Sequence, residues 1–275
     1  MPTTGGSLAG VTRIIRWQKG RAPAQVRDRL APEEPLEIRV DSRPVSVTMR
    51  TPGHDEELAV GFLLTEGLVK RPADVVAVRP YPRNELGNVV DVLLSPDVTV
   101  DMARLTRHGF ASSSCGLCGK ASIASVRGQF PRVRSRVTVA AETLLTLPDA
   151  MRAAQATFAA TGGLHAAALF TSEGEMLLLR EDVGRHNAVD KVRGRAFLDG
   201  MLPLGRHVLL VSGRTSFEIL QKALAGGVAI VAAVSAPSSL AVEFARANGQ
   251  TLVGFLRENR FNVYAVGRRV RFPAA

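Results

Sequence analysis

The fold is decided by residues 207–255, which read HVLLVSGRTSFEILQKALAGGVAIVAAVSAPSSLAVEFARANGQTLVGF. Short apolar runs alternate here with amphipathic stretches, and Gly226-Gly227 and Asn248-Gly249 close two of these stretches as glycine closes helices. The pattern predicts helices over 216–225 and 238–247, separated by strands over 207–211, 228–234 and 251–255. Alternating strands and helices are typical of an α/β layered fold with a mostly parallel sheet.

The same alternation extends along most of the chain. In the second half it predicts two further helices, over 148–160 and 187–198, and three further strands, over 164–170, 176–180 and 261–266. The first half is richer in strands, which we expect over 35–40, 45–50, 75–79 and 88–94, with one helix over 56–69. We therefore expect three regions, namely a flexible basic arm (1–25), a smaller β-rich N-terminal part (26–140) with a cysteine-containing loop (about 106–120), and an α/β domain (141–275).

Composition narrows the functional classes. The 275 residues carry 35 Lys and Arg against 25 Asp and Glu, a net charge of +10, so the surface should attract anions such as nucleotides or acidic proteins. Aromatic residues are only 5%, which disfavours a binder of single-stranded nucleic acid. Apolar runs fall short of the roughly 20 residues that span a bilayer, and Met1–Gly10 lacks the order of a signal peptide, so a cytoplasmic location is expected.

The strongest chemical motif is the run Ser112-Ser113-Ser114-Cys115-Gly116-Leu117-Cys118-Gly119-Lys120, which holds both cysteines of the chain. Serine and glycine around the pair leave little side chain to bury it, and a nearby cation would favour the thiolate, which is the nucleophilic form. A zinc site is disfavoured because four ligands are needed, and no third cysteine or paired histidines are present. A thioredoxin-like site is disfavoured because the pair lies mid-chain in a predicted loop. Two options remain: a small apolar cysteine pair that packs in the loop without a chemical role, and a loop whose cysteine carries sulfur as a persulfide.

A second signal comes from polar segments that follow successive predicted strands. Arg185 and His186 follow one strand, Ser212-Gly213-Arg214 follows another, and Ser235 to Ser239 follow a third. Ligands of open α/β sheets bind beyond the carboxyl ends of strands, where helix N-termini favour anions. A nucleotide or phosphate site is therefore predicted there, although neither a Walker loop nor a Gly-x-Gly-x-x-Gly motif is present.

A third signal is the polar turn after the strand at 251–255. Here Arg257 and Arg260 could clamp phosphates, and asparagine side chains such as Asn259 could read the edge of a base or pterin. An exposed hairpin turn without a ligand remains the alternative.

Several motifs are spread along the chain, namely RTPG (50–53) with EELAVGFL (56–63), SSCGLCGK (113–120), EDVGRHNAVDK (181–191), SGR (212–214) and FNVY (261–264). Taken together, these motifs resemble the formate dehydrogenase accessory sulfurtransferase family (FdhD), from about Glu34 to the last strand.

The resemblance implies a function. Such proteins take sulfur from a cysteine desulfurase and transfer it to the molybdenum of bis-molybdopterin guanine dinucleotide, which then enters the catalytic subunit of formate dehydrogenase. It also implies a homodimer with a fold similar to cytidine deaminases but without zinc. By the same resemblance, Cys115 is the persulfide carrier, Cys118 is a possible secondary residue, and the cofactor is bound by Phe255, Leu256, Arg257, Glu258, Asn259 and Arg260, together with Arg185, His186, Ser212, Gly213 and Arg214.

Two other functional classes stay open at this point. One is a chaperone that binds and delivers the guanine dinucleotide cofactor without covalent sulfur chemistry. The other, weaker, is a basic nucleic-acid-binding protein, for which binding should depend steeply on salt. We expect neither nucleic acid nor membrane as a partner.

Overall fold

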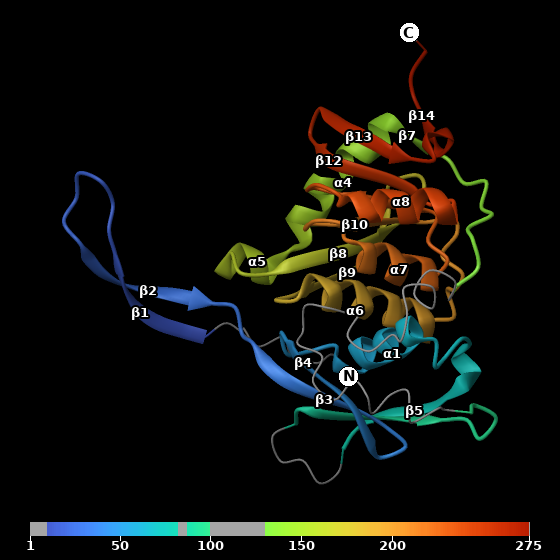
Figure 1. Ribbon diagram of the computed structural model, residues 1–275. Coiled ribbons are helices and arrows are strands. Elements are labelled where there is room, and N and C mark those ends of the chain that lie inside the picture. The colour runs from blue at the N-terminus through green and yellow to red at the C-terminus, as the bar shows by residue number, and fades with distance from the viewer. Residues whose placement is uncertain (1–9, 82–86, 100–129, 275) are drawn as a thin grey trace.

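The computed structural model describes residues 10–81, 87–99 and 130–274. A six-stranded sheet forms the centre of the second half (Figure 1), in the order β13-β12-β11-β10-β8-β9. Its strands are β8 (His165–Phe170), β9 (Met176–Asp182), β10 (Val208–Val211), β11 (Ile230–Ala233), β12 (Thr251–Arg257) and β13 (Arg260–Ala265).

This sheet is mixed, with its parallel pairs at the centre. Strand β11 pairs in parallel with both β10 and β12, because helices carry the chain across between them, whereas β8–β9, β8–β10 and β12–β13 are antiparallel. The layered α/β fold class is confirmed, but parallel pairing is confined to these three strands rather than running through most of the sheet. The deaminase-like detail of the prediction stays a prediction.

Helices cover both faces of the sheet. Three of them, α6 (Arg185–Leu198), α7 (Phe217–Ala225) and α8 (Ser239–Asn248), lie on the face toward the viewer in Figure 1. Side chains alternate between the faces: Leu169 and Leu209 pack in the core with these helices, whereas Phe170 and Leu210 pack in the core with α4 (Ala141–Ala154). Two cores, one on each side, therefore fix this sheet.

The helix predicted over 148–160 is wrong in its boundaries. Helix α4 begins seven residues earlier, at Ala141, and contains Pro148, while α5 (Ala156–Thr161) is a separate helix after Gln155. Proline is favoured in the first turn of a helix, but burial of Leu144 and Leu147 holds the preceding residues in α4, so Pro148 lies inside it. The short pieces nearby are β7 (Val139–Ala140), which pairs in parallel with β14 (Val270–Arg271), and the 3-10 turn η2 (Gly267–Arg269).

The first half contains a smaller sheet, in the order β4-β3-β6-β5. Its strands are β3 (Glu34–Val40), β4 (Arg43–Arg50), β5 (Val75–Pro80) and β6 (Val89–Leu94), with the 3-10 turn η1 (Pro72–Asp74) before β5. Helix α1 (Asp55–Glu66) packs on it and, on its other side, against α6 (Figure 1). Phe197 of α6 belongs to the same core as Leu36 and Leu63, so the two halves share hydrophobic packing, and the predicted boundary at 140/141 stays a prediction.

The crossing of α1 and α6 depends on two glycines. A Cβ at Gly61 would lie 2.0 Å from the carbonyl oxygen of Asp190, and a Cβ at Gly194 would lie 1.8 Å from that of Glu57. Either would overlap main-chain atoms, so any other residue would push the helices apart.

Part of the region expected to be a flexible arm forms a hairpin instead. Strands β1 (Gly10–Arg16) and β2 (Ala24–Leu30) pair antiparallel along their full length and project from the body (Figure 1). The prediction is wrong for these residues because a hairpin with no buried face lacks the clean alternation that marks a strand in sequence. Within the described ranges, no helix is long and apolar enough to cross a membrane.

Candidate functional site

The predicted polar segments meet at one edge of the six-stranded sheet. Strands β9, β10, β11 and β12 all point toward this edge, and β8, which runs the opposite way, begins there. We call it the strand-end edge and define it as His165 together with residues 183–186, 212–216, 234–238 and 255–260. The topology of the sheet therefore brings together four loops that are spread over residues 183–260 of the sequence.

Ser212 and Gly213 bring the end of β10 close to His165. The hydroxyl of Ser212 accepts a hydrogen bond from the amide of Ala166 at 2.9 Å, and its own amide donates to the Ala166 carbonyl at 2.9 Å. A Cβ at Gly213 would lie 3.3 Å from Nδ1 of His165 and 3.6 Å from Cδ of Arg185. A side chain at position 213 would therefore crowd both His165 and Arg185, and glycine leaves room for these two side chains.

These side chains line a small cavity. It has a volume of about 170 Å³, and its walls are Glu33, Met49, His165, Val183, Gly184, Arg185 and His186. Arg185 and His186 were predicted to bind the cofactor, whereas Glu33 and Met49 come from the N-terminal half and were not expected. The missed signal was the RTPG motif, which follows Met49 directly.

His186 is held by a carboxylate that sequence analysis missed. Its Nε2 lies 3.0 Å from Oε2 of Glu218 and 3.4 Å from the hydroxyl of Ser216, which itself donates to the same carboxylate oxygen at 3.2 Å. Glu218 lies in the first turn of α7, where carboxylates are common as partners of the helix N-terminus, so its sequence position gave no separate sign of a site. The contact fixes the ring and favours hydrogen on Nε2.

Arg185 is the residue of this cavity that favours an anion, while Glu33 adds a carboxylate to the lining. Burial, then the charge of Arg185 and the neighbouring His186, lowers the pKa of His165, which keeps that ring neutral at physiological pH. The Nε of Arg185 is buried and has no hydrogen-bond partner among the described residues. A buried guanidinium donor without a partner is costly, and a bound anion would remove that cost.

The predicted segment 255–260 forms the tight connection between β12 and β13. Phe255 is 40% exposed with a positive φ of 51°, and its amide donates to the carbonyl of Ser235 at 3.1 Å. Arg257, Glu258, Asn259 and Arg260 are exposed. In the described part of the chain, no ion pair involves Arg214, Arg257 or Arg260, so the edge presents unneutralised guanidinium groups to a ligand.

Leu256 does not fit the predicted role. Its side chain is fully buried in the core on the α4 face of the sheet, because β12 alternates between faces at this point. Its side chain therefore anchors the strand and cannot contact a ligand at the surface.

The motif at 181–191 serves the interior as well as the edge. Asp182 is fully buried, and its carboxylate lies 2.7 Å from Nζ of Lys191 and accepts hydrogen bonds from the amides of Thr51 and Gly184 and from the side chain of Asn187. Lys191 also donates to the carbonyl of Thr51 at 2.8 Å. Residues 183–186 of this motif line the cavity, while its inward residues join α6 to the segment after β4.

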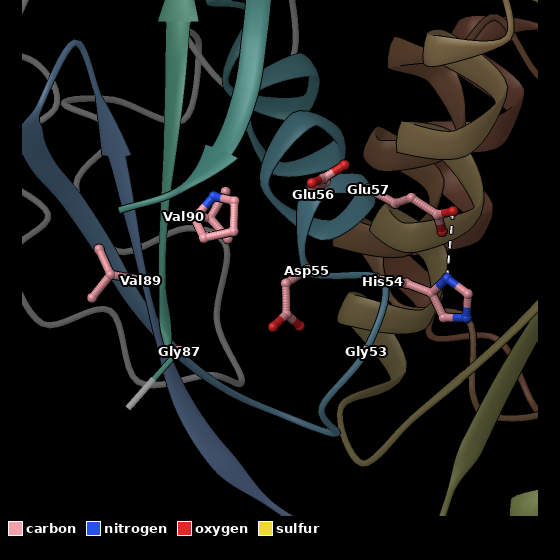
Figure 2. A pocket seen from close by; sticks show the side chains of 9 residues that line it. Gly53, His54, Asp55, Glu56, Glu57, Gly87, Val89 and Val90 are labelled. Carbon is pink, nitrogen blue, oxygen red and sulfur yellow. Dashed lines mark ion pairs between the residues drawn. The ribbon is translucent and has the colours of Figure 1, made fainter. Parts of the chain in front are cut away.

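A larger cavity of about 320 Å³ lies beside the start of α1, away from the predicted residues. Figure 2 shows its acidic lining, which includes Asp55, Glu56 and Glu57. Two of these are already paired: Asp55 binds Arg50 through two hydrogen bonds of 2.9 Å, and Glu57 binds Arg180 at 2.6 Å, with His54 3.4 Å away (Figure 2). We therefore assign no ligand to it.

Cys115 and Cys118 lie outside the described residues, so their predicted roles stay predictions. Within the described ranges, no group of three or more His, Cys, Asp or Glu side chains could hold a metal ion, and the expectation of no zinc site likewise stays a prediction.

Comparison with known proteins identifies relatives over nearly the whole chain. A relative from Mycobacterium tuberculosis, named sulfur carrier protein FdhD, is 55% identical over 251 residues, which cover 88% of this chain and 91% of the relative. A protein of the same name from Streptomyces coelicolor is 50% identical over 278 residues, 98% of each chain. A crystal structure from Desulfotalea psychrophila, described as a formate dehydrogenase accessory protein, superposes with a TM-score of 0.79 over 96% of this chain and 100% of that chain. At 22% identity, that match supports the fold alone.

The model of the FdhD/NarQ family matches residues 31–271. That range contains the six-stranded sheet, both cores, the strand-end edge and the two cysteines, and it begins directly after the β1–β2 hairpin. From this match and the identities of its relatives, the chain belongs to the FdhD/NarQ family.

Proposed function

We propose that this protein is a sulfur carrier that loads sulfur on Cys115 and passes it to the molybdenum of bis-molybdopterin guanine dinucleotide, for use by formate dehydrogenase. Relatives that are 50–55% identical carry the name sulfur carrier protein, and a structural neighbour is described as a formate dehydrogenase accessory protein. The structural observation that carries the proposal is the unneutralised cationic edge around Arg185, which suits a ligand with two pyrophosphate groups.

Loading of Cys115 is a sulfur exchange with a cysteine desulfurase. The Cys115 thiolate attacks the outer sulfur of the donor's persulfide, the bond between the donor's two sulfurs breaks, and the donor cysteine leaves as a thiolate. The product is a persulfide on Cys115. The exchange requires no external electrons because one sulfur–sulfur bond replaces another.

Delivery of the sulfur as sulfide needs two electrons, and Cys118 can supply them. Its thiolate attacks Sγ of Cys115, the sulfur–sulfur bond of the persulfide breaks, and hydrosulfide leaves toward the molybdenum. A Cys115–Cys118 disulfide remains, which cellular reductants must open before the next cycle. The outer sulfur is reduced while the two cysteines are oxidised, so atoms and electrons balance.

The strand-end edge holds the cofactor during this transfer. Arg185, Arg214, Arg257 and Arg260 bind phosphate oxygens, and amide groups at the start of α6 and α7 add donors. Asn259 and Phe255 contact the guanine or pterin. The cofactor is cargo in this scheme, and the protein acts as a cytoplasmic homodimer with the desulfurase as donor and the dehydrogenase as client.

The test compares Cys115→Ala with its matched control Cys118→Ala. After incubation with a desulfurase and cysteine, mass spectrometry should find one added sulfur on the Cys115 peptide of the wild type and of Cys118→Ala. Formate dehydrogenase activity in cells should be abolished by Cys115→Ala. Full activity in that variant would refute the carrier role.

A non-covalent cofactor chaperone is the second candidate, because the cationic edge alone would suffice for it. It predicts that guanosine diphosphate binds at the strand-end edge while the wild type gains no sulfur. Guanosine diphosphate titrations on the same samples therefore separate the two functions.

A further inference from the structure

The β1–β2 hairpin has no role in the proposed sulfur transfer, and it precedes the residues that match the family model. It projects from the body as an isolated two-stranded ribbon (Figure 1). Such a hairpin is marginally stable in water unless something packs on it. The described residues leave every position of both strands half-buried or exposed, so a partner that packs on the hairpin would stabilise it.

One face of the hairpin combines apolar and cationic side chains. Val11, Arg13 and Ile15 alternate on β1 and are paired with Arg29, Arg27 and Gln25 on β2, so these six residues share a face. Val11 is 62% exposed, Ile15 is 71% exposed, and Trp17, directly after the strand, is 66% exposed. Nothing among the described residues covers these apolar groups.

The same face carries positive charge, and no ion pair among the described residues involves Arg13, Arg27 or Arg29. Arg13 lies directly opposite Arg27, and like charges at opposed positions destabilise a sheet. The hairpin's one acid, Asp28, is paired opposite Thr12 and therefore belongs to the other face, where it lies 3.5 Å from Arg16. Residues 10–30 hold six Lys and Arg against one Asp, a net +5 within a chain of net +10. The face therefore fits an acidic surface.

The base of the hairpin lies beside the strand-end edge. A Cβ at Gly163 would lie 2.9 Å from Cβ of Ala31, which follows β2, and Thr51 donates to the carbonyl of Pro32 at 3.1 Å. Glu33, which directly follows Pro32, lines the cavity together with Arg185 and His165. In Figure 1 the hairpin extends from the side where α5 leads into β8, which is the side of that edge.

We propose that the hairpin is a docking arm for the apo catalytic subunit of formate dehydrogenase, which it grips through an acidic surface with an apolar patch. The inference rests on the proposed function, because a protein held by this arm lies over the edge from which the cofactor leaves. A second copy of the chain is disfavoured as the occupant, since the residues outside the hairpin also carry a net +5. Nucleic acid is disfavoured because phosphates would leave Val11 and Ile15 uncovered, whereas tryptophan and arginine are enriched in protein interfaces.

The first experiment measures the affinity of the purified full-length chain for the purified apo catalytic subunit of the same organism. The variant Arg13→Gln/Arg27→Gln/Arg29→Gln should weaken binding roughly tenfold or more and flatten its salt dependence. The matched control, Arg132→Gln/Arg134→Gln/Arg136→Gln, removes three exposed arginines from the extended segment on the opposite side of the molecule (Figure 1) and should change the affinity less than about twofold.

The second experiment uses the only tryptophan of the chain as a reporter in the unaltered sequence. Growth with 5-fluorotryptophan gives one fluorine resonance from Trp17, which should shift or broaden when the apo subunit binds. An unchanged resonance at saturating subunit, or equal affinities for the hairpin variant and the control, would overturn the docking role. A shift with duplex DNA at physiological salt but not with the subunit would overturn it as well, in favour of nucleic acid.

Failure of this inference is distinguishable from failure of the proposed function. Sulfur loading on Cys115 and binding of guanosine diphosphate do not involve the arm, so both should be unchanged in the hairpin variant. If those two activities persist while docking is lost, the arm is confirmed as a partner-specific element. If they persist and docking is unaffected, only the arm's role is refuted.

Discussion

The α1–α6 interface and its surroundings and the strand-end edge are both rich in charged side chains. They differ in how many of these side chains form ion pairs. Inside, Asp182 meets Lys191, Glu57 meets Arg180, and Asp190 contacts Lys222 and Arg193. At the edge, Arg185 keeps a buried donor without a partner in the described part of the chain, and Arg214, Arg257 and Arg260 form no ion pair there. These interior cations each contact a carboxylate, although Arg193 also keeps two buried nitrogens without a described partner. At the edge, His186 contacts Glu218, whereas the four arginines form no described ion pair and are available to an anion.

The contrast is sharpest within α6. Arg185 and His186 line the cavity at the first turn, and Lys191, less than two turns later, is 1% exposed. Whether a charged side chain of this helix stabilises the fold or faces the cavity depends on its direction and its partner, not on the motif that contains it. Substitutions of the paired interior residues should therefore lower stability, whereas substitutions at the strand-end edge should weaken ligand binding.

The largest expected change in the free energy of unfolding comes from the buried ion pair between Asp182 and Lys191. Asp182→Ala leaves the buried ammonium of Lys191 without its carboxylate and leaves two amides without an acceptor, which should lower the free energy of unfolding by about 3–5 kcal/mol. Chemical denaturation monitored by circular dichroism measures it.

The matched control is Asp199→Ala, whose partner Arg195 is exposed, and its effect should stay below about 1 kcal/mol. If the two variants are equally stable, the inner charges do not hold the architecture and the contrast between the regions fails.

The next effect depends on pH. Burial alone would raise the pKa of Glu57, but hydrogen bonds from Arg180 and His54 lower it to about 2 from 4.5. A carboxyl with a depressed pKa stabilises the folded state above its unfolded pKa, and this contribution disappears as the pH falls from about 5 to about 2. The wild type should exceed Glu57→Gln in stability by on the order of 3 kcal/mol at pH 7, and the gap should close across that acidic window.

Denaturation series at several pH values test this. Glu56→Gln, a substitution at the exposed neighbour, should follow the wild type throughout. A gap between wild type and Glu57→Gln that stays constant down to pH 2 would mean that the Arg180 ion pair does not shift this group.

The sequence predicted the edge better than the interior. Strand direction places Ser212, Arg214 and Arg185 at one edge from the order of elements alone, because parallel strands joined by helices end on the same side. Which residues of a strand end face inward depends on the exact register, which the resemblance over 255–260 does not resolve, and the side chain of Leu256 proves to be buried in the core.

Interior contacts depend on distances that periodicity does not encode. Gly61 and Gly194 inside predicted helices were the available signal, since glycine weakens a helix unless close packing requires it. The partner of each glycine, a carbonyl on the opposite helix, could be known only from the fold. The β1–β2 hairpin escaped prediction for the converse reason, because neither of its faces is fully buried by the described residues.

The smallest expected change in free energy lies at the edge, and it decides whether the comparison holds. Arg185→Gln should weaken binding of guanosine diphosphate by roughly 10- to 100-fold, because a charge-assisted hydrogen bond contributes about 1.5–3 kcal/mol. Its stability should equal or exceed that of the wild type, since no described ion pair is lost and a buried donor without a described partner is removed. Isothermal titration calorimetry and thermal unfolding of the same sample give both values, with Arg195→Gln as the exposed control. Loss of stability with unchanged binding would place Arg185 with the interior charges, and the cationic edge would then lose the residue that most favours an anion.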